Sequence, residues 1–202
     1  MLNKFKFFMQ QSWLLLLASF LFGLMIAVAD SAWKPKVEAN KTAKIKNLMK
    51  GLINAASFDI AVKDANIQSS KGLVKTDIYK ALDDKGNVLG FEYIASGSGF
   101  GDKIELIVAV DANCEKYLGY QVLSSNETPG FGDKIKTDGF RKQFINAPAV
   151  EFALTKVGKP ENIDNEIVAI SGATVTSTAM INIFNKSLVS VKDALSQKGL
   201  IK

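Results

Sequence analysis

Ile104–Val110 reads IELIVAV, and this stretch decides the fold class. Every second residue from Ile104 onward is a branched aliphatic residue, whereas the positions between them include Glu105. A period of two is typical of a β-strand with one strongly buried face. The polar stretch Asp111–Lys116 follows, and Leu118–Leu123 is again mostly apolar. The sequence therefore predicts a β-hairpin.

Elements on both sides of this hairpin extend the same picture. Thr76–Leu82 and Val88–Ala95 flank the turn residues Asp83–Asn87, which predicts a second hairpin. Farther along the chain, Phe140–Phe144 predicts one or two helical turns, and Ala147–Thr155 predicts another strand.

The end of the chain predicts a long amphipathic helix. One apolar stripe recurs there at helical spacing: Met180, Phe184, Leu188, Val191 and Leu195. Together with the two hairpins, this helix predicts an α+β domain with an antiparallel β-sheet and packed helices.

The N-terminal segment Trp13–Ala29 reads WLLLLASFLFGLMIAVA and carries no charge. Its length approaches the ~20 apolar residues that cross a bilayer. Trp13 and Trp33 lie at its two edges, where tryptophan favours the membrane–water interface. A cleaved signal peptide is the competing interpretation, because Ala27–Ala29 has the small-x-small form of a cleavage site.

These patterns divide the chain into four predicted segments. Residues 1–12 precede the span, 13–29 form a transmembrane helix, 30–57 form a juxtamembrane linker and an amphipathic helix, and 58–202 form the main domain. Pro35 is expected to break the polar linker. The lysine-rich outer face of the amphipathic helix is either solvated or in contact with anionic lipid.

Composition excludes several classes of site. The first 50 residues hold eight lysines against two acidic residues, so the net charge of +5 is concentrated there and the main domain lacks the basic surface of a nucleic-acid-binding protein. With no histidine and one cysteine, Cys114, the chain cannot supply the ligands of a zinc, haem or iron–sulfur site, nor a Ser–His or Cys–His pair. Any redox chemistry therefore requires an organic cofactor.

The hexapeptide Gly-Phe-Gly-Asp-Lys-Ile occurs twice, at Gly99–Ile104 and at Gly130–Ile135. Each copy follows a predicted strand. The two copies are either related loops or the result of chance or a shared turn requirement.

The segment Ser171–Ser177 joins a short apolar run to the C-terminal helix. It is rich in hydroxyl groups, and Gly172 allows close approach of the backbone to a ligand. The first turn of a helix presents unpaired N–H groups and the positive end of the helix dipole, so this segment can hold a phosphate. The alternative is that Thr174 or Thr176 is only an N-cap.

The sequence Ser171-Gly172-Ala173-Thr174, with Val175-Thr176-Ser177 after it, resembles the flavinylation motif of the FMN-binding domain family. Glu127-Thr128-Pro129-Gly130-Phe131-Gly132 resembles the family's Glu-Thr-Pro-Gly-Leu-Gly segment, with Phe131 in place of leucine. The resemblance covers nearly the whole chain.

The resemblance implies a cofactor and its attachment. It implies FMN joined by a phosphodiester to Thr174, through a flavin transferase that uses FAD as donor. The residues implied to bind this cofactor are Thr174, Ser171, Gly172, Ala173, Thr176, Ser177, Glu127, Thr128, Gly130 and Phe131. Thr128 and Phe131 are expected beside the isoalloxazine ring.

The chain is most similar to the RnfG component of Rnf-type ion-translocating ferredoxin:NAD oxidoreductases, and next to the NqrC component of the sodium-translocating NADH:quinone reductase. This similarity implies an electron-transfer subunit with other subunits of a membrane complex as partners, and not a complete enzyme. It also implies a single-pass anchor in the inner (cytoplasmic) membrane, with residues 1–12 as a cytoplasmic tail and 58–202 as an FMN-binding electron-transfer domain on the periplasmic side.

One position departs from the family pattern. The motif generally has an aspartate six residues before the acceptor threonine, and Val168 occupies that position, with Asp164 and Glu166 nearby. A flavin-free structural subunit is therefore one alternative, and a free-standing extracytoplasmic flavoprotein is another.

Overall fold

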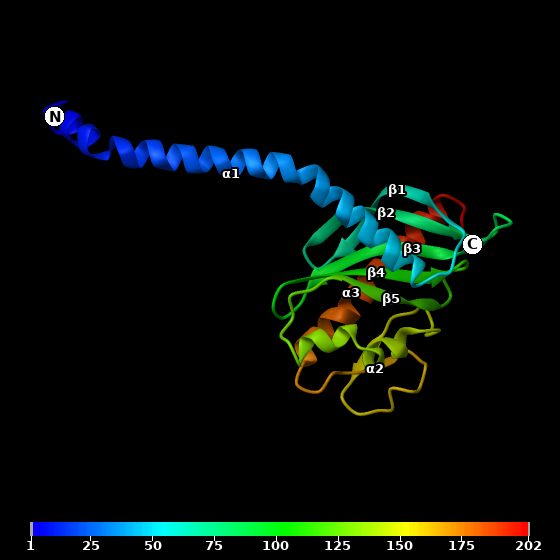
Figure 1. The fold of residues 1–202 in the computed structure, drawn as a ribbon. Coiled ribbons are helices and arrows are strands. Elements are labelled where there is room, and N and C mark those ends of the chain that lie inside the picture. Colours follow the sequence, from blue (N-terminus) through cyan, green and yellow to red (C-terminus); the bar gives the residue numbers. More distant parts are fainter. Residues whose placement is uncertain (1, 202) are drawn as a thin grey trace. The chain divides into compact units, whose positions relative to one another are not determined.

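A computed structural model describes residues 2–201. A long helix, α1 (Leu2–Lys50), precedes five strands that pair in chain order into one antiparallel sheet: β1 (Ser57–Ser69), β2 (Gly72–Leu82), β3 (Val88–Ser98), β4 (Lys103–Asp111) and β5 (Tyr117–Ser124). Figure 1 shows these strands side by side. Both predicted hairpins are confirmed, with β2 paired to β3 and β4 paired to β5.

The second half of the chain contains short elements and one long helix. In chain order they are the 3-10 helix η1 (Gly132–Lys136), α2 (Asp138–Arg141), the 3-10 helix η2 (Lys142–Phe144), β6 (Ala153–Thr155), β7 (Glu166–Val168) and α3 (Thr174–Gln197). β6 and β7 form a separate parallel pair. The predicted α+β class, with an antiparallel sheet and packed helices, is confirmed.

The main core lies between α3 and one face of the sheet. The predicted apolar stripe of α3 is buried there, together with aromatic residues of the sheet and of η2. Phe184 of α3 stacks on Phe144 with ring centroids 4.6 Å apart and meets the edge of Tyr117 at 5.1 Å. Burial of such large rings is the main stabilising contribution to this layer.

The opposite face of the sheet is covered by the end of α1 and the turn that follows it. Met49 packs with Ile107 and Leu123, while Ile53 packs with Ala81 and Ala109. The compact domain accordingly begins at Ile45, so the predicted amphipathic stretch is part of its core.

The expected helix break at Pro35 is wrong, because α1 is continuous through it. A proline inside a helix removes one backbone donor and crowds the carbonyl four residues earlier. The neighbours Ala32, Lys34 and Lys36 favour helix and offset this cost. Within residues 2–201, one helical stretch, Gln10–Lys50, is long and apolar enough to cross a bilayer, a test that a signal sequence also meets.

The structure also contains one strand that the sequence did not predict, and it shortens one predicted strand. Strand β1 was not predicted, because Lys63, Asp64 and Asn66 interrupt its apolar pattern; the structure accommodates them with register shifts and a left-handed Asp64 (φ 51°). The strand predicted at Ala147–Thr155 is reduced to β6. Its first part forms only an isolated bridge between Pro148 and Lys116.

Candidate functional site

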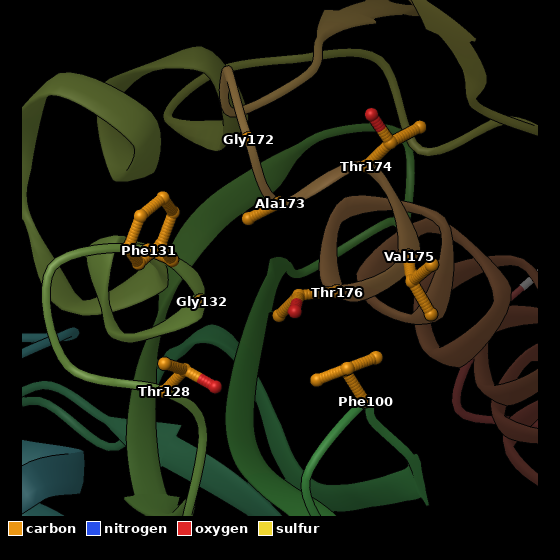
Figure 2. Close-up of a pocket in the computed structure, with 9 residues that line it drawn as sticks. All are labelled: Phe100, Thr128, Phe131, Gly132, Gly172, Ala173, Thr174, Val175 and Thr176. Carbon is orange, nitrogen blue, oxygen red and sulfur yellow. The ribbon is translucent and has the colours of Figure 1, made fainter.

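A cavity of about 440 Å³ lies at the N-terminus of α3. Three segments that are far apart in the sequence meet there: the β3–β4 loop, the loop after β5, and the start of α3 (Figure 2). The residues that line it are Phe100, Thr128, Phe131, Gly132, Gly172, Ala173, Thr174, Val175 and Thr176. None of these nine side chains carries a charge, so the cavity walls combine apolar surface with hydroxyl and backbone groups.

Thr174 is the first residue of α3, and Ala173 occupies the N-cap position without a side-chain hydrogen bond. The N-cap alternative for Thr174 and Thr176 is therefore wrong, because both lie inside the first helical turn. The side chain of Thr174 is exposed, and within residues 2–201 its hydroxyl makes no hydrogen bond. An exposed hydroxyl without a partner is available for chemical modification.

The backbone around Thr174 favours an anion. The N–H groups of Thr174, Val175 and Thr176 belong to the first turn of α3, where the helix supplies no acceptor. The dipole of this 24-residue helix adds a partial positive charge at the same end. A phosphate at the Thr174 hydroxyl would gain from both effects.

Ser177 fixes the turn that leads into the helix. Its buried hydroxyl accepts from the Ile170 N–H at 3.0 Å and donates to the Ala173 carbonyl at 3.0 Å. Gly172 adopts a left-handed φ of +79°, and a Cβ added there would lie 3.0 Å from the Phe131 ring. Ser177 is therefore a support behind the cavity, and Gly172 leaves room for Phe131.

Glu127 is the second support. Its carboxylate is buried and accepts from the Thr176 hydroxyl at 2.5 Å and from the Gly101 N–H at 3.0 Å. Hydrogen bonds to a charged group are the stronger kind, so this carboxylate ties the β3–β4 loop to the first turn of α3. Gly132 allows the arrangement, because a Cβ there would lie 2.7 Å from Glu127 Oε2 and 2.8 Å from Thr176 Oγ1.

The two copies of the repeated hexapeptide meet at this cavity. Phe100 comes from the first copy and Phe131 from the second, and both rings are exposed (Figure 2). The sequence leaves related loops as one of two interpretations of the copies. It does not predict that they meet at a cavity or that Phe100 lines it. One feature of the sequence could have indicated the role of Phe100: both copies of the hexapeptide place a large aromatic residue between two glycines.

The structure brings together part of the predicted set. Thr174, Gly172, Ala173, Thr176, Thr128 and Phe131 line the cavity. The predicted residues outside the lining are Ser171, Ser177, Glu127 and Gly130. Phe100, Gly132 and Val175 line it without having been predicted. The acidic residues near Val168, Asp164 and Glu166, do not line it either, and the Asp164 carboxylate accepts from the Glu166 N–H at 2.7 Å.

Comparison with known proteins agrees with this geometry. Residues 99–189 match the model of a family described as FMN-binding domain, and this range contains all nine lining residues. The structure of NqrC from Shewanella oneidensis superposes with a TM-score of 0.56 at 21% identity, covering 73% of this chain and 71% of that one. This likeness shows that the fold is shared.

Relatives by sequence are G subunits of membrane complexes. The G subunit of the proton-translocating ferredoxin:NAD(+) oxidoreductase complex of Clostridium ljungdahlii is 35% identical over 91% of this chain and 87% of its own length. Its counterpart in the Na(+)-translocating ferredoxin:NAD(+) oxidoreductase complex of Acetobacterium woodii is 30% identical over 75% and 73%. The G subunit of the ion-translocating oxidoreductase complex of Methanosarcina acetivorans is 33% identical, and the match spans about half of each protein, 54% of this chain and 55% of that one. The chain therefore belongs to the FMN-binding domain family, in its branch of G subunits of ion-translocating oxidoreductase complexes.

Proposed function

We propose that this chain is a membrane-anchored electron-transfer subunit that carries FMN bonded through its phosphate to Thr174. The observation that carries the proposal is the exposed hydroxyl of Thr174, which makes no hydrogen bond within residues 2–201 and lies at the N-terminus of α3 beside a cavity with two aromatic residues. Membership of the FMN-binding domain family supports the choice of cofactor.

The cavity suits the phosphate and the isoalloxazine ring of FMN. As a diester, the phosphate keeps one negative charge, which the helix dipole and the free N–H groups stabilise. A volume of about 440 Å³ is within the range of small-molecule sites. Phe100 and Phe131 offer aromatic surface to the isoalloxazine ring, and Thr128 offers a hydroxyl to its polar edge. Gly130, Ser171 and Ser177 shape the loops around these groups.

Attachment requires an activated donor. In the proposed step the Thr174 oxygen forms a bond to the FMN phosphorus of FAD, the phosphoanhydride bond to AMP breaks, AMP leaves, and the hydroxyl proton is released. A flavin transferase is the proposed catalyst. The bound flavin supplies the redox chemistry, while this chain holds the phosphate, orients the ring and keeps the cofactor from dissociating.

Membership of the family supports a proposed cellular setting. We place the chain in an Rnf-type complex, where it relays electrons between redox centres of neighbouring subunits while an ion is moved. The apolar stretch inside α1 is the proposed single-pass anchor in the inner membrane, with residues 58–202 on the periplasmic side. An NqrC-like role in a sodium-translocating NADH:quinone reductase is the second candidate, supported by the shared fold.

The proposal is tested by Thr174→Val in cells that contain an active flavin transferase. We expect complete loss of flavin fluorescence from the protein band on a denaturing gel, with a normal protein level. The intact mass should fall by the mass of the attached group, beyond the small change from the substitution. Thr178→Val is the matched control, because Thr178 is an exposed threonine one turn later, and it should keep the flavin. Fluorescence retained by Thr174→Val would falsify the assignment.

One departure favours an alternative. Val168 stands where the family generally has an aspartate, which supports a flavin-free structural subunit of the same type of complex. Intact mass of the wild-type chain from native membranes separates the two, because only the flavoprotein carries the added mass. Co-purification with polytopic membrane subunits distinguishes a complex subunit from a free-standing flavoprotein.

A further inference from the structure

Glu92 is the most unusual buried group outside the cavity. It lies on β3, where its register partners are Tyr79 of β2 and Ala109 of β4. Its side chain is fully buried, and within residues 2–201 neither carboxyl oxygen has a hydrogen-bond partner. An ionised carboxylate without a partner is very costly in such surroundings, so the neutral acid is the favoured form.

The surface that buries Glu92 is made by the segment Ile45–Ile53. The apolar residues of this segment pack on the sheet around the partners of Glu92: Ile53 joins Ala81 and Ala109, and Tyr79 lies in the neighbouring Met49 cluster. The approach is close, since a Cβ added at Gly90 would lie 3.0 Å from the Ile53 side chain. If this segment leaves the sheet, Glu92 becomes accessible to water.

We propose that docking of Ile45–Ile53 on the sheet is coupled to protonation of Glu92, so that loss of this proton releases the segment. Ile45–Lys50 is the end of α1, the helix that contains the proposed membrane anchor. Proton concentration on the side of the membrane that holds the domain therefore controls how tightly the domain holds the end of its anchor helix. This inference does not depend on the flavin.

The electrostatics support the coupling. Burial raises the pKa of Glu92 to about 8; the Ile53 backbone, which does not reach hydrogen-bonding geometry with this carboxyl group, has a smaller effect in the opposite direction. Tyr79 beside it is also neutral, since burial and then Asp77 raise its pKa. None of the charged side chains around the site contributes to the Glu92 shift; those on this face of the sheet or on the packed helix include Asp77, Glu105, Asp111, Lys46 and Lys50.

The sign of the effect follows from linkage. The docked state holds the Glu92 proton up to a pH of about 8, whereas an exposed glutamate releases it near its ordinary value of 4.5. Docking therefore takes up a proton between these values, and is strongest at low pH. In this window the ratio of docked to released segment should fall about tenfold for each pH unit.

The test is hydrogen exchange of the full chain in lipid nanodiscs between pH 5 and pH 8, corrected for intrinsic exchange. The reporters are the amides of Gly51, Leu52 and Ile53, which bond to the Asn47, Leu48 and Met49 carbonyls in the docked turn. In the wild type we expect protection to fall about tenfold per pH unit. Glu92→Gln should show no such slope, because an amide does not titrate. Glu105→Gln, which removes a carboxylate from the same face, should keep the wild-type slope.

A flat wild-type profile, or an unchanged slope in Glu92→Gln, would overturn the proposal. If Glu92→Gln does not fold, titration of the wild-type glutamate carboxyl carbons by NMR decides. One midpoint near pH 8 supports the proposal, and all midpoints near the ordinary glutamate value contradict it.

Discussion

The two copies of Gly-Phe-Gly-Asp-Lys-Ile have the same six residues and different backbones. Gly99–Ile104 turns from β3 into β4, and the Gly99 N–H bonds to the Asp102 carbonyl at 2.8 Å. Gly130–Ile135 leads into the 3-10 helix η1 instead, with the Phe131 N–H bonded to the Thr128 carbonyl at 3.2 Å. The neighbours make the difference: the first copy continues two paired strands, whereas the second follows Pro129 and leaves the sheet.

What the copies share is the destination of their side chains. In both, the phenylalanine is exposed at the cavity and the isoleucine is fully buried. Both copies also surround the Glu127 carboxylate, the first through Gly99 and Gly101 and the second through Gly132. Side-chain chemistry thus decided where each residue goes, while the flanking chain decided the backbone path.

Glu127→Ala should cause the largest loss of stability, because both copies surround the carboxylate that it removes. It leaves the buried Thr176 hydroxyl and the partly buried Gly101 N–H without their acceptor. Leaving a buried polar group unpaired costs about 1–3 kcal/mol, so we expect a loss of about 3 kcal/mol in the free energy of unfolding. Denaturant titration in a Thr174→Val background measures this without a contribution from bound flavin. A loss similar to that of an exposed site such as Glu115→Ala would show that Glu127 does not join the loops.

The first glycines of the two copies, Gly99 and Gly130, have different surroundings, so substitution by alanine should have different costs. A Cβ at Gly99 would overlap Glu127 Oε1 and lie 2.8 Å from the Asp102 carbonyl, whereas a Cβ at Gly130 meets open space at a left-handed φ of +77°. We expect Gly99→Ala to cost about 2 kcal/mol through overpacking and Gly130→Ala about 1 kcal/mol through backbone strain. Thermal unfolding of the two variants compares them directly. Equal losses would mean that the two glycines are kept for the same reason.

The aspartate of the first copy should give the smallest effect. Hydrogen bonds from the Lys103 backbone and the Asn126 side chain hold the pKa of Asp102 below its ordinary value. A lowered folded pKa stabilises the fold above the ordinary value of 3.8, and this stabilisation is lost as pH falls through the folded pKa. Asp102→Asn should therefore be slightly less stable than the wild type at pH 7, with the difference vanishing in acid. Asn126→Ala should reproduce part of the change, and a difference that persists in acid would argue against this origin.

Much of the fold was predictable because it rests on local pattern. The alternating residues of Ile104–Val110 bury one face of a strand, and the apolar stripe of α3 buries one face of a helix. Both periodicities can be recognised directly in the sequence. Strand β1 was not predictable in the same way, because its bulge at Asp64 is held by a bond from the Asp64 N–H to the Asp77 carboxylate on the neighbouring strand. Pairing between strands supplied what the local pattern lacked.

The candidate site was likewise predictable where it depends on local sequence and not where it depends on contacts between distant segments. The motif around Thr174 and the Glu127–Gly132 segment could be identified from residue order, because close approach of a backbone to a phosphate requires small and hydroxyl residues in sequence. The position of Thr174 inside the first turn, the burial of Glu127 and the approach of Phe100 all depend on contacts between segments far apart in the chain.

By itself the sequence determined that the chain has an apolar N-terminal span, an antiparallel sheet, a C-terminal helix, and a hydroxyl-rich turn without metal-binding chemistry. Only the tertiary structure decided that two identical hexapeptides with different backbones meet at one cavity, and that Glu92 lies beneath the end of α1 without a hydrogen-bond partner within residues 2–201. The physical reason is that periodicity and residue type act within one element, whereas burial and hydrogen-bond partners are set by the surfaces that other elements bring.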